Sequence, residues 1–495
     1  MSRVYLSIDQ GTTSSRAIVF NLDTGEIIAQ AQKQFTQYFP NSGWVEHDGE
    51  EIWQSVCSVS NQALLEAEKA VENVVGIGLT NQRETTLIWD RKTGKAIHRA
   101  IVWQDRRTSE HCQTLIKNGN EDEIADRAGL VIDPYFSASK IAWILDNVEG
   151  ARARAEKGEL AFGTVETFLI WRLTNGEQHI SDATNASRTS LLNIKTAKWD
   201  EKLCALFNVP MAILPEIVDC AGNLGSAKAG ITKQLPILSA IGDQQSAAVG
   251  QACFFPGAVK ATYGTGCFVI LNTGDRIVKS SNRMLTTIGL QINQKRTYAM
   301  EGSIFIAGAV VQWLRDRFSI LDDASQSDKI ASELTSNHGL YLVPAFTGLG
   351  APHWSPEARG AIYGITRDTG PEHFIRAALE AVAYQTNDLI SAMAQDGMSP
   401  TNIRVDGGMA ANNWLMQFLS DIINIKVERP LQLETTALGA AILAGVADGK
   451  FSSIEDTALS WNLDRHFNSN MAPSTRRNLT SGWYQAVMKT RLSVS

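Results

Sequence analysis

A strand–turn–strand pattern at the N-terminus constrains the fold of this chain more than any other feature of its sequence. An apolar run leads into SIDQGTTSSR, residues 7–16, and a second apolar run follows directly. Gly11 lets the backbone approach an oxyanion closely, and Thr12, Thr13 and Ser14 supply hydroxyl and amide donors. The pattern predicts a hairpin that binds phosphate groups; the alternative is an ordinary tight hairpin.

Asp9 lies at the start of this turn. A carboxylate so close to a phosphate needs a cation between them, so Asp9 is predicted to contact a metal ion or its bound water. The segment lacks the Gly-Lys-Thr of a Walker loop. Because a strand rather than a helix follows, it is not a dinucleotide-binding fingerprint either.

The composition narrows the classes of function that remain. With 495 residues the chain is too long for one hydrophobic core, so several domains are expected. A net charge of −7 and a pI of about 5.7 argue against a nucleic-acid partner. No apolar run reaches the ~18 residues of a membrane helix, and no signal peptide precedes the first strand. Six scattered cysteines fit reduced thiols, so a cytoplasmic protein without a membrane span is predicted.

The strand–turn–strand pattern returns in the second half of the chain, at residues 258–271. Two such units, residues 1–250 and 251–495, predict a duplicated α/β domain with a nucleotide held between the copies. Alternation and turn signals predict the main strands at 3–8, 15–20, 26–34, 74–80 and 402–406. Helical periodicity predicts helices at 50–70, 106–117, 140–147, 166–173, 303–318, 411–423 and 437–447.

Polar residues gather at the end of the predicted strand 74–80, in the segment TNQRETT. Ligands of open α/β sheets bind outside the carboxyl ends of the strands. Arg83 and Glu84 offer both donors and acceptors there, as vicinal hydroxyl groups require. The alternative is a surface ion pair that contributes little.

Asp243 ends an apolar strand-like run and precedes a helix of small residues. A carboxylate at such a junction can orient a hydroxyl group and accept its proton, so Asp243 is a candidate general base. A helix N-cap is the alternative, and the sequence does not decide between the two.

Two further glycine sites lie in the second half. Thr265 is at the centre of the second hairpin turn, where it is predicted to close on the terminal phosphates. Gly407 and Gly408 end a strand and open a helix, which predicts a flat surface for an adenosine. A plain strand–helix turn is the alternative for this pair.

Together these motifs resemble the FGGY family of carbohydrate kinases, within the superfamily of actin, heat-shock ATPases and sugar kinases. The resemblance covers nearly the whole chain and includes YFSASKIAW at 135–143, GAIYG at 360–364 and AALE at 377–380. The segments that are most similar to family members acting on glycerol are GWVEHD (43–48), TNQRETT (80–86), AIVWQDRRT (100–108), GDQQ (242–245), YGTGCF (263–268) and PAFTGLGAP (344–352).

The resemblance implies a role for each matching residue. Glycerol hydroxyls would contact Arg83, Glu84, Tyr135, Asp243 and Gln244, with Trp103 and Phe268 against the carbon chain. ATP phosphates would contact Thr12, Thr13, Ser14, Arg16 and Thr265. The nucleoside would contact Gly308, Gln312, Gly408 and Asn412. Asp9 and Asp243 would lie nearest to Mg²⁺, directly or through water.

The resemblance also implies the fold and the assembly. We expect two duplicated ribonuclease H-like (actin-like ATPase) domains, each with a mixed five-stranded sheet, with the active-site cleft between them. ATP and Mg²⁺ are the implied cofactors, glycerol is the implied substrate, and a homodimer or homotetramer is the implied assembly. The alternatives are a family member acting on a pentulose, erythritol or gluconate, and an ATP-gated binding module of the actin or heat-shock type.

Overall fold

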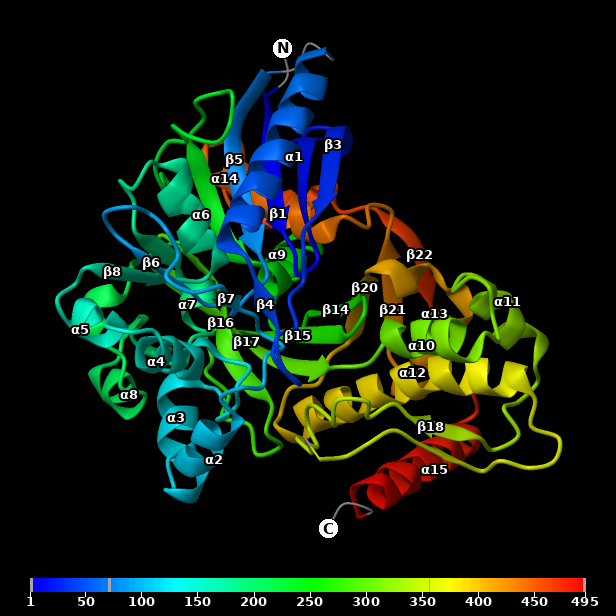
Figure 1. The fold of residues 1–495 in the computed structure, drawn as a ribbon. Helices are drawn as coiled ribbons and strands as arrows, with labels where there is room; N and C mark the ends of the chain where they lie inside the picture. Colours follow the sequence, from blue (N-terminus) through cyan, green and yellow to red (C-terminus); the bar gives the residue numbers. More distant parts are fainter. Residues whose placement is uncertain (1–2, 70–72, 356, 493–495) are drawn as a thin grey trace.

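The computed structural model describes residues 3–69, 73–355 and 357–492. Two α/β halves, each built on a mixed sheet, lie side by side (Figure 1). The first half is coloured blue to green in Figure 1, and the second half green to red. The duplicated α/β architecture predicted from the two hairpin patterns is confirmed.

The first sheet has five strands in the order β13-β5-β1-β2-β3. Strands β1, β2 and β3 form an antiparallel meander, and β5 and β13 continue the sheet in parallel. Gly25, at φ +76°, makes the tight turn between β2 and β3. The bounds are Arg3–Gln10 (β1), Ser14–Asn21 (β2), Glu26–Gln34 (β3), Asn73–Asn81 (β5) and Ile237–Gly242 (β13).

The second sheet repeats this arrangement and extends it. Its central strands β21-β20-β14-β15-β17 have the same order and the same directions as β13-β5-β1-β2-β3. Edge strands β16 and β22 pair antiparallel at the two sides, so the sheet has seven strands and the prediction of five was wrong for this half. The bounds are Val259–Tyr263 (β14), Cys267–Gly274 (β15), Leu285–Ile292 (β16), Lys295–Ile304 (β17), Asn402–Asp406 (β20), Lys426–Pro430 (β21) and Leu463–Phe467 (β22).

Helices cover both faces of the first sheet. Successive side chains of a strand point to opposite faces, so Val4 and Leu6 pack with α1 (Gly49–Lys69), whereas Tyr5 packs with α14 (Thr435–Ala447). A β-carbon on Gly78 would lie 2.2 Å from the backbone oxygen of Ala440, so only glycine permits this close crossing. Helix α14 of the second half therefore completes the core of the first half, and the division at residue 250 stays a prediction.

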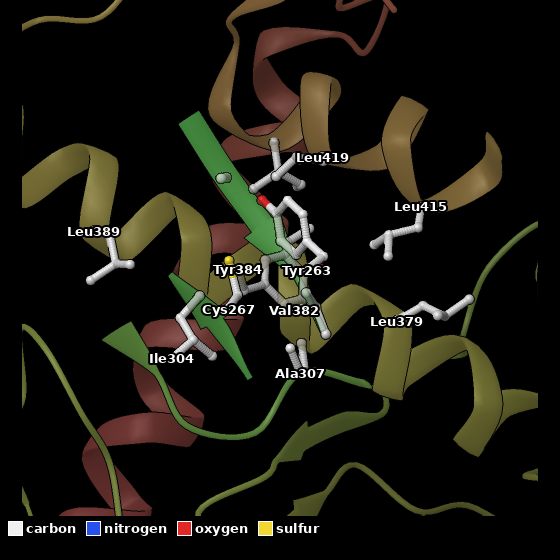
Figure 2. Packing of buried hydrophobic residues seen from close by; sticks show 14 of the residues in the cluster. Tyr263, Cys267, Ile304, Ala307, Leu379, Val382, Tyr384, Leu389, Leu415 and Leu419 are labelled. Atoms are coloured by element: carbon white, nitrogen blue, oxygen red, sulfur yellow. The ribbon is translucent and has the colours of Figure 1, made fainter. Parts of the chain in front are cut away.

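A second core lies under the second hairpin, between the second sheet and helices α12 (Pro371–Gln395) and α13 (Asn413–Ile423). Figure 2 shows Tyr263 and Cys267, which flank the hairpin turn, packed among Val382, Tyr384 and Leu419. The Tyr263 hydroxyl lies 3.1 Å from the Thr386 hydroxyl. This apolar packing holds the base of the hairpin while its turn stays at the surface.

The remaining elements form lobes around the two sheets. Further helices are α2 (Ser109–Lys117), α3 (Glu121–Ala128), α4 (Ser137–Asn147), α5 (Ala151–Glu156), α6 (Val165–Leu173), α7 (Ala183–Ala186), α8 (Glu201–Leu206), α9 (Asp243–Gly250), α10 (Gly308–Phe318), α11 (Gln326–Glu333) and α15 (Pro473–Leu492). Short strands are β4 (Glu46–His47), β6 (Leu87–Asp90), β7 (Ala100–Ile101), β8 (Leu160–Gly163), β9 (Ile180–Asp182), β10 (Leu192–Asn193), β11 (Lys198–Trp199), β12 (Glu216–Val218), β18 (Tyr341–Val343) and β19 (Ala361–Tyr363).

The predicted helices exist, with some shifted bounds. The helix expected at 303–318 begins only at Gly308, because β17 extends through Ile304 and pairs with β15. The first three residues of the predicted helix 106–117 precede α2, and Ala70 of the predicted helix 50–70 lies outside the described residues. Among the described residues, no helix is both long and apolar enough to cross a membrane.

Candidate functional site

The first hairpin has the compact turn that its sequence predicts. The Gly11 amide donates to the Ser14 carbonyl across 2.9 Å, and the hydroxyl of Thr13 lies on an exposed residue at the tip. The Thr12 hydroxyl accepts a hydrogen bond from the indole Nε1 of Trp103 at 2.9 Å, and the Ser14 hydroxyl accepts one from Gln32. The hydroxyl and amide groups therefore gather at one end of the β1–β2 pair.

Asp9 and Arg16 face each other across the same pair of strands. Burial raises the pKa of Asp9 to about 7, the Arg16 guanidinium lowers it, and the negative charge of Asp243 raises it further. Arg16 also forms an ion pair with Glu434, beside α14. Asp9 and Asp243 thus lie within electrostatic reach of each other, which is the arrangement in which a shared cation is favourable.

Within the described ranges, no cluster of three or more His, Cys, Asp or Glu side chains is close enough to ligate a metal ion. A site with fewer than three such side chains is still compatible with Mg²⁺, because this ion binds through one or two carboxylates together with substrate phosphates and water. Asp9 and Asp243 are the candidate carboxylates for such an ion, because the charge of Asp243 acts on Asp9.

Arg83 follows β5 and is almost fully buried. Its two Nη atoms donate to the two carboxylate oxygens of Glu301, at 2.7 and 2.8 Å. Nη1 also donates to Gln245 at 3.1 Å, and Nε lies 3.3 Å from an oxygen of Asp243. The guanidinium plane is thus fixed, with one edge toward Asp243.

Glu84 is also buried, with 1% of its surface exposed, against 3% for Arg83. The interpretation as a surface ion pair was therefore wrong. Arg188 donates from Nε to the Glu84 carboxylate at 2.6 Å. Burial raises the pKa of Glu84, while Arg83 and Arg188 lower it. Glu84 has φ +60°, an uncommon backbone conformation for a residue other than glycine, and such outliers concentrate at functional sites.

Three aromatic side chains lie beside these charges. The ring of Trp103 meets that of Tyr135 edge-on at 5.7 Å and that of Phe268 at 5.8 Å. The Tyr135 hydroxyl accepts a hydrogen bond from Arg83 Nη2 at 3.4 Å. Phe268 comes from β15 of the second half, so both halves contribute to this aromatic group.

Asp243 is the first residue of α9, directly after β13. The N-cap of this helix is Gly242, so the N-cap alternative for Asp243 was wrong. Its side chain is 26% exposed and lies beside Arg83. Burial raises the pKa of Asp243, while Arg83 and Lys260 lower it. The neighbouring Gln244 accepts a hydrogen bond from the Lys260 ammonium at 2.5 Å.

The second hairpin places Thr265 at an exposed turn. The Gly264 amide donates to the Gly266 carbonyl at 2.9 Å, and the Thr265 carbonyl accepts from the amides of Ala307 and Ala309, at 2.9 and 3.1 Å. A β-carbon on Gly308 would lie 2.6 Å from the Gly264 oxygen. The start of α10 is therefore tied directly to the turn that carries Thr265.

The predicted nucleoside residues lie on an open surface of the second half. Gly407, at φ +84°, touches the Tyr263 backbone, and a β-carbon there would come within 2.5 Å of it. A β-carbon on Gly408, by contrast, would meet no atom within 4 Å. Asn412 accepts from the Leu415 amide and so caps α13, and Gln312 is exposed on α10. Strand–helix geometry thus explains Gly407, whereas the space beside Gly408 is open.

Sequence reasoning missed the buried charges that hold the predicted residues in place. Glu301, Arg188 and Lys260 have no exposed surface. Glu301 binds Arg83 and Arg188, and Lys260 binds Gln244. The available signal was a charge inside an apolar strand, as in YAMEGSIF around Glu301, because such a residue needs a buried partner.

The chain matches two family models that together span most of its length. Residues 4–250 match the N-terminal domain, and residues 259–447 the C-terminal domain, of the FGGY family of carbohydrate kinases. The chain belongs to this family.

Relatives of known name extend over the whole chain. It is 55% identical to glycerol kinase 1 of Pseudomonas aeruginosa, over 99% of both chains, and 55% identical to glycerol kinase of Rhodospirillum centenum, over 98% of both. Among solved structures it is similar to Plasmodium falciparum glycerol kinase with ADP, with a TM-score of 0.92, 39% identity and coverage of 99% and 98%. Gluconate kinase from Lactobacillus acidophilus, at 19% identity, shares the fold with a TM-score of 0.88.

Proposed function

We propose that this chain is an ATP-dependent glycerol kinase that converts glycerol to sn-glycerol 3-phosphate and ADP. The observation that carries the proposal is full-length identity of 55% to glycerol kinases, combined with a buried site that suits a small polyol. Arg83, Glu84, Tyr135 and Asp243 offer donors and acceptors in one place, next to the aromatic ring of Trp103.

Asp243 is the general base in this proposal. Phosphoryl transfer depends on in-line positioning and charge neutralisation more than on covalent chemistry. The Asp243 carboxylate would accept the proton of the attacking hydroxyl, and Arg83, 3.3 Å away, would keep both the carboxylate and the polyol in register. Glu84 and Gln244 would accept and donate hydrogen bonds to the remaining hydroxyls.

The nucleotide would be held by the two hairpins. Thr12, Thr13, Ser14, Arg16 and Thr265 would bind the phosphates, and Gly308, Gln312, Gly408 and Asn412 would bind the nucleoside. Asp9 and Asp243 would hold Mg²⁺, which supplies charge neutralisation on the phosphates when bound. The exposed turns at Thr13 and Thr265 leave hydroxyl and amide donors free for this role.

Two parts of the proposal concern the setting of the enzyme. The six cysteines of the chain are unpaired, which fits a reducing cytoplasm. A homodimer or homotetramer is the proposed assembly, and light scattering of the purified protein at several concentrations measures it.

The decisive experiment measures ADP release with ATP and Mg²⁺ in the presence and absence of glycerol. We expect release to depend on glycerol and to stop when a chelator removes the metal. The product is identified with a dehydrogenase specific for sn-glycerol 3-phosphate. ADP release with gluconate or a pentulose but not with glycerol would assign another member of the family, and glycerol-independent hydrolysis would favour an ATP-gated binding module.

A further inference from the structure

Glu301 lies at the centre of the polyol site although it belongs to the second half. It is on β17, where it pairs with Ile270 of β15 and Leu285 of β16. Its carboxylate has no exposed surface. One oxygen accepts from Arg83 Nη1 at 2.7 Å, and the other from Arg83 Nη2 at 2.8 Å and Arg188 Nη2 at 3.1 Å.

The bidentate contact with Glu301 determines which N–H donors of Arg83 remain available to a ligand. A guanidinium has five N–H donors in one plane. Glu301 accepts one hydrogen bond from each Nη atom, and Gln245 accepts a hydrogen bond from the second N–H of Nη1. The second donor of Nη2 makes only a long 3.4 Å contact to Tyr135, and Nε faces Asp243. The Glu301 carboxylate thus turns the free edge of Arg83 toward Tyr135 and Asp243.

Glu301 also offsets the positive charge of the two buried arginines that it contacts. Arg83 and Arg188 are both buried and both contact Glu301. The carboxylates of Glu84 and Asp243 also lie beside these arginines. Burial raises the pKa of Glu301, but Arg188 and Arg83 lower it more, to about 2. Glu301 is therefore ionised at neutral pH, and its negative charge offsets positive charge on the two buried arginines that it contacts.

We propose that Glu301 is a positioning residue that orients Arg83 for the polyol, so that a side chain from the second half completes a binding site whose contacts come mainly from the first. The inference rests on the proposed function, because glycerol is the probe. Glu301 itself touches Arg83 and Arg188 and acts on the substrate through Arg83.

Two substitutions test this role. Glu301→Asp keeps the charge but withdraws the carboxylate by one bond length, and Glu301→Gln keeps the shape but removes the charge. We expect the KM for glycerol to rise at least about tenfold in both, which corresponds to about 1.4 kcal/mol of lost binding, while the KM for ATP changes less than about twofold.

A matched control separates positioning from simple loss of stability. Glu380 is another buried carboxylate paired with an arginine, Arg376 at 2.9 Å, within α12 of the second half. Glu380→Gln should leave the KM for glycerol unchanged, because loss of folded protein lowers kcat per total enzyme but does not alter KM. If Glu301→Gln fails to fold, Glu301→Asp decides the matter, because it retains the charge.

The outcomes are distinguishable from failure of the proposed function. If the unmodified protein does not phosphorylate glycerol, the proposed function fails before any variant is compared. If the unmodified protein is active and folded Glu301→Asp keeps its KM for glycerol within about twofold, Glu301 does not position Arg83. Equal increases in the KM for glycerol and for ATP would also overturn the inference, because the contact is specific to Arg83.

Discussion

The residues proposed to bind the polyol and those proposed to bind the nucleotide lie in contrasting surroundings. Arg83 and Glu84 are almost fully buried and held by ion pairs to Glu301 and Arg188. Of the predicted nucleotide residues of the second half, Thr265, Gln312 and Gly408 are exposed, and Gly308 and Asn412 are partly exposed. A small polyol offers few atoms, so its recognition needs desolvated donors in fixed positions. A nucleotide offers many charged oxygens, which hydroxyl and backbone groups at an open surface can bind.

The largest effect is expected from a substitution of Asp243, the residue that is proposed to contact both the polyol and the metal ion of the nucleotide. Asp243→Asn keeps the size of the side chain but removes the proton acceptor, so we expect turnover to fall by about 10²–10⁴-fold with nucleotide affinity nearly unchanged. Steady-state kinetics and calorimetry with ADP measure the two quantities. Asp126→Asn, which changes an exposed carboxylate paired with Lys195, serves as the control. More than a tenth of the original turnover in Asp243→Asn would show that Asp243 is not the base.

The second prediction uses substrate size to test how closed the polyol side is. Trp103 lies against both Phe268 and Tyr135. If the polyol binds against these rings, as proposed, a fourth or fifth carbon would have little room. We expect glycerol to exceed xylulose, ribulose and gluconate by at least about 10²-fold in kcat/KM, because longer sugars clash or leave buried polar groups unpaired. Dihydroxyacetone and glyceraldehyde should be the best substitutes. A pentulose that outperforms glycerol would contradict the substrate assignment and leave the kinase assignment intact.

The third prediction concerns the loss of stability in acid that follows from the burial of His47. His47 is fully buried and contacts Gln37 and Gln82. Burial lowers its pKa from 6.5 to about 4, although Glu51 raises it slightly. Between those values the unfolded chain binds a proton that the folded chain does not. The free energy of unfolding should therefore fall from pH 6.5 to pH 4 by at most about 3 kcal/mol from this group, and level off below.

Chemical unfolding followed by circular dichroism across this pH range measures the effect. His47→Gln removes the titrating group and keeps a hydrogen-bonding side chain. The difference in unfolding free energy between the two proteins should therefore change with pH. A difference that stays constant between pH 7 and pH 4 would exclude His47 as a source of acid sensitivity.

The smallest effect is expected from a substitution among the exposed residues that are proposed to bind the nucleotide. Thr265→Val removes one hydroxyl at an exposed turn and leaves the backbone contacts to Ala307 and Ala309 in place. The loss of one hydrogen bond to a charged phosphate should raise the KM for ATP by about tenfold, with glycerol affinity unchanged. Calorimetry with glycerol and with ADP separates the two. Collapse of glycerol affinity with intact nucleotide affinity would reverse the assignment of the two sides.

Much of this molecule could be predicted from its sequence. Local patterns predicted both hairpins, the meander of β1, β2 and β3, and the junction of β13 with α9 at Asp243, because strand alternation and turn residues act over a few positions. The second sheet was predicted two strands short. Edge strands such as β22 are short and mostly exposed, so their apolar pattern is weak.

Strand β16 and the late start of α10 both depend on strand β17, because β16 pairs with β17 and α10 begins after β17 ends. Strand β17 extends through Ile304 because Ile304 pairs with Cys267 of β15. The apolar residues from Ser303 onward fit a helix equally well when read alone. Pairing with a neighbouring strand, rather than local propensity, sets the boundary.

The sequence alone determined the family, and it predicted the two hairpins and the junction of β13 with α9 at Asp243, because each of these depends on residues that are close in the chain. Only the tertiary structure decided that Arg83 is buried rather than a surface ion pair, and that Glu301, 218 positions away, holds it. It also decided that α14 completes the first core, where Gly78 and Ala440 touch. These contacts join distant segments, and a charge in an apolar strand reveals its need for a partner but not the identity of that partner.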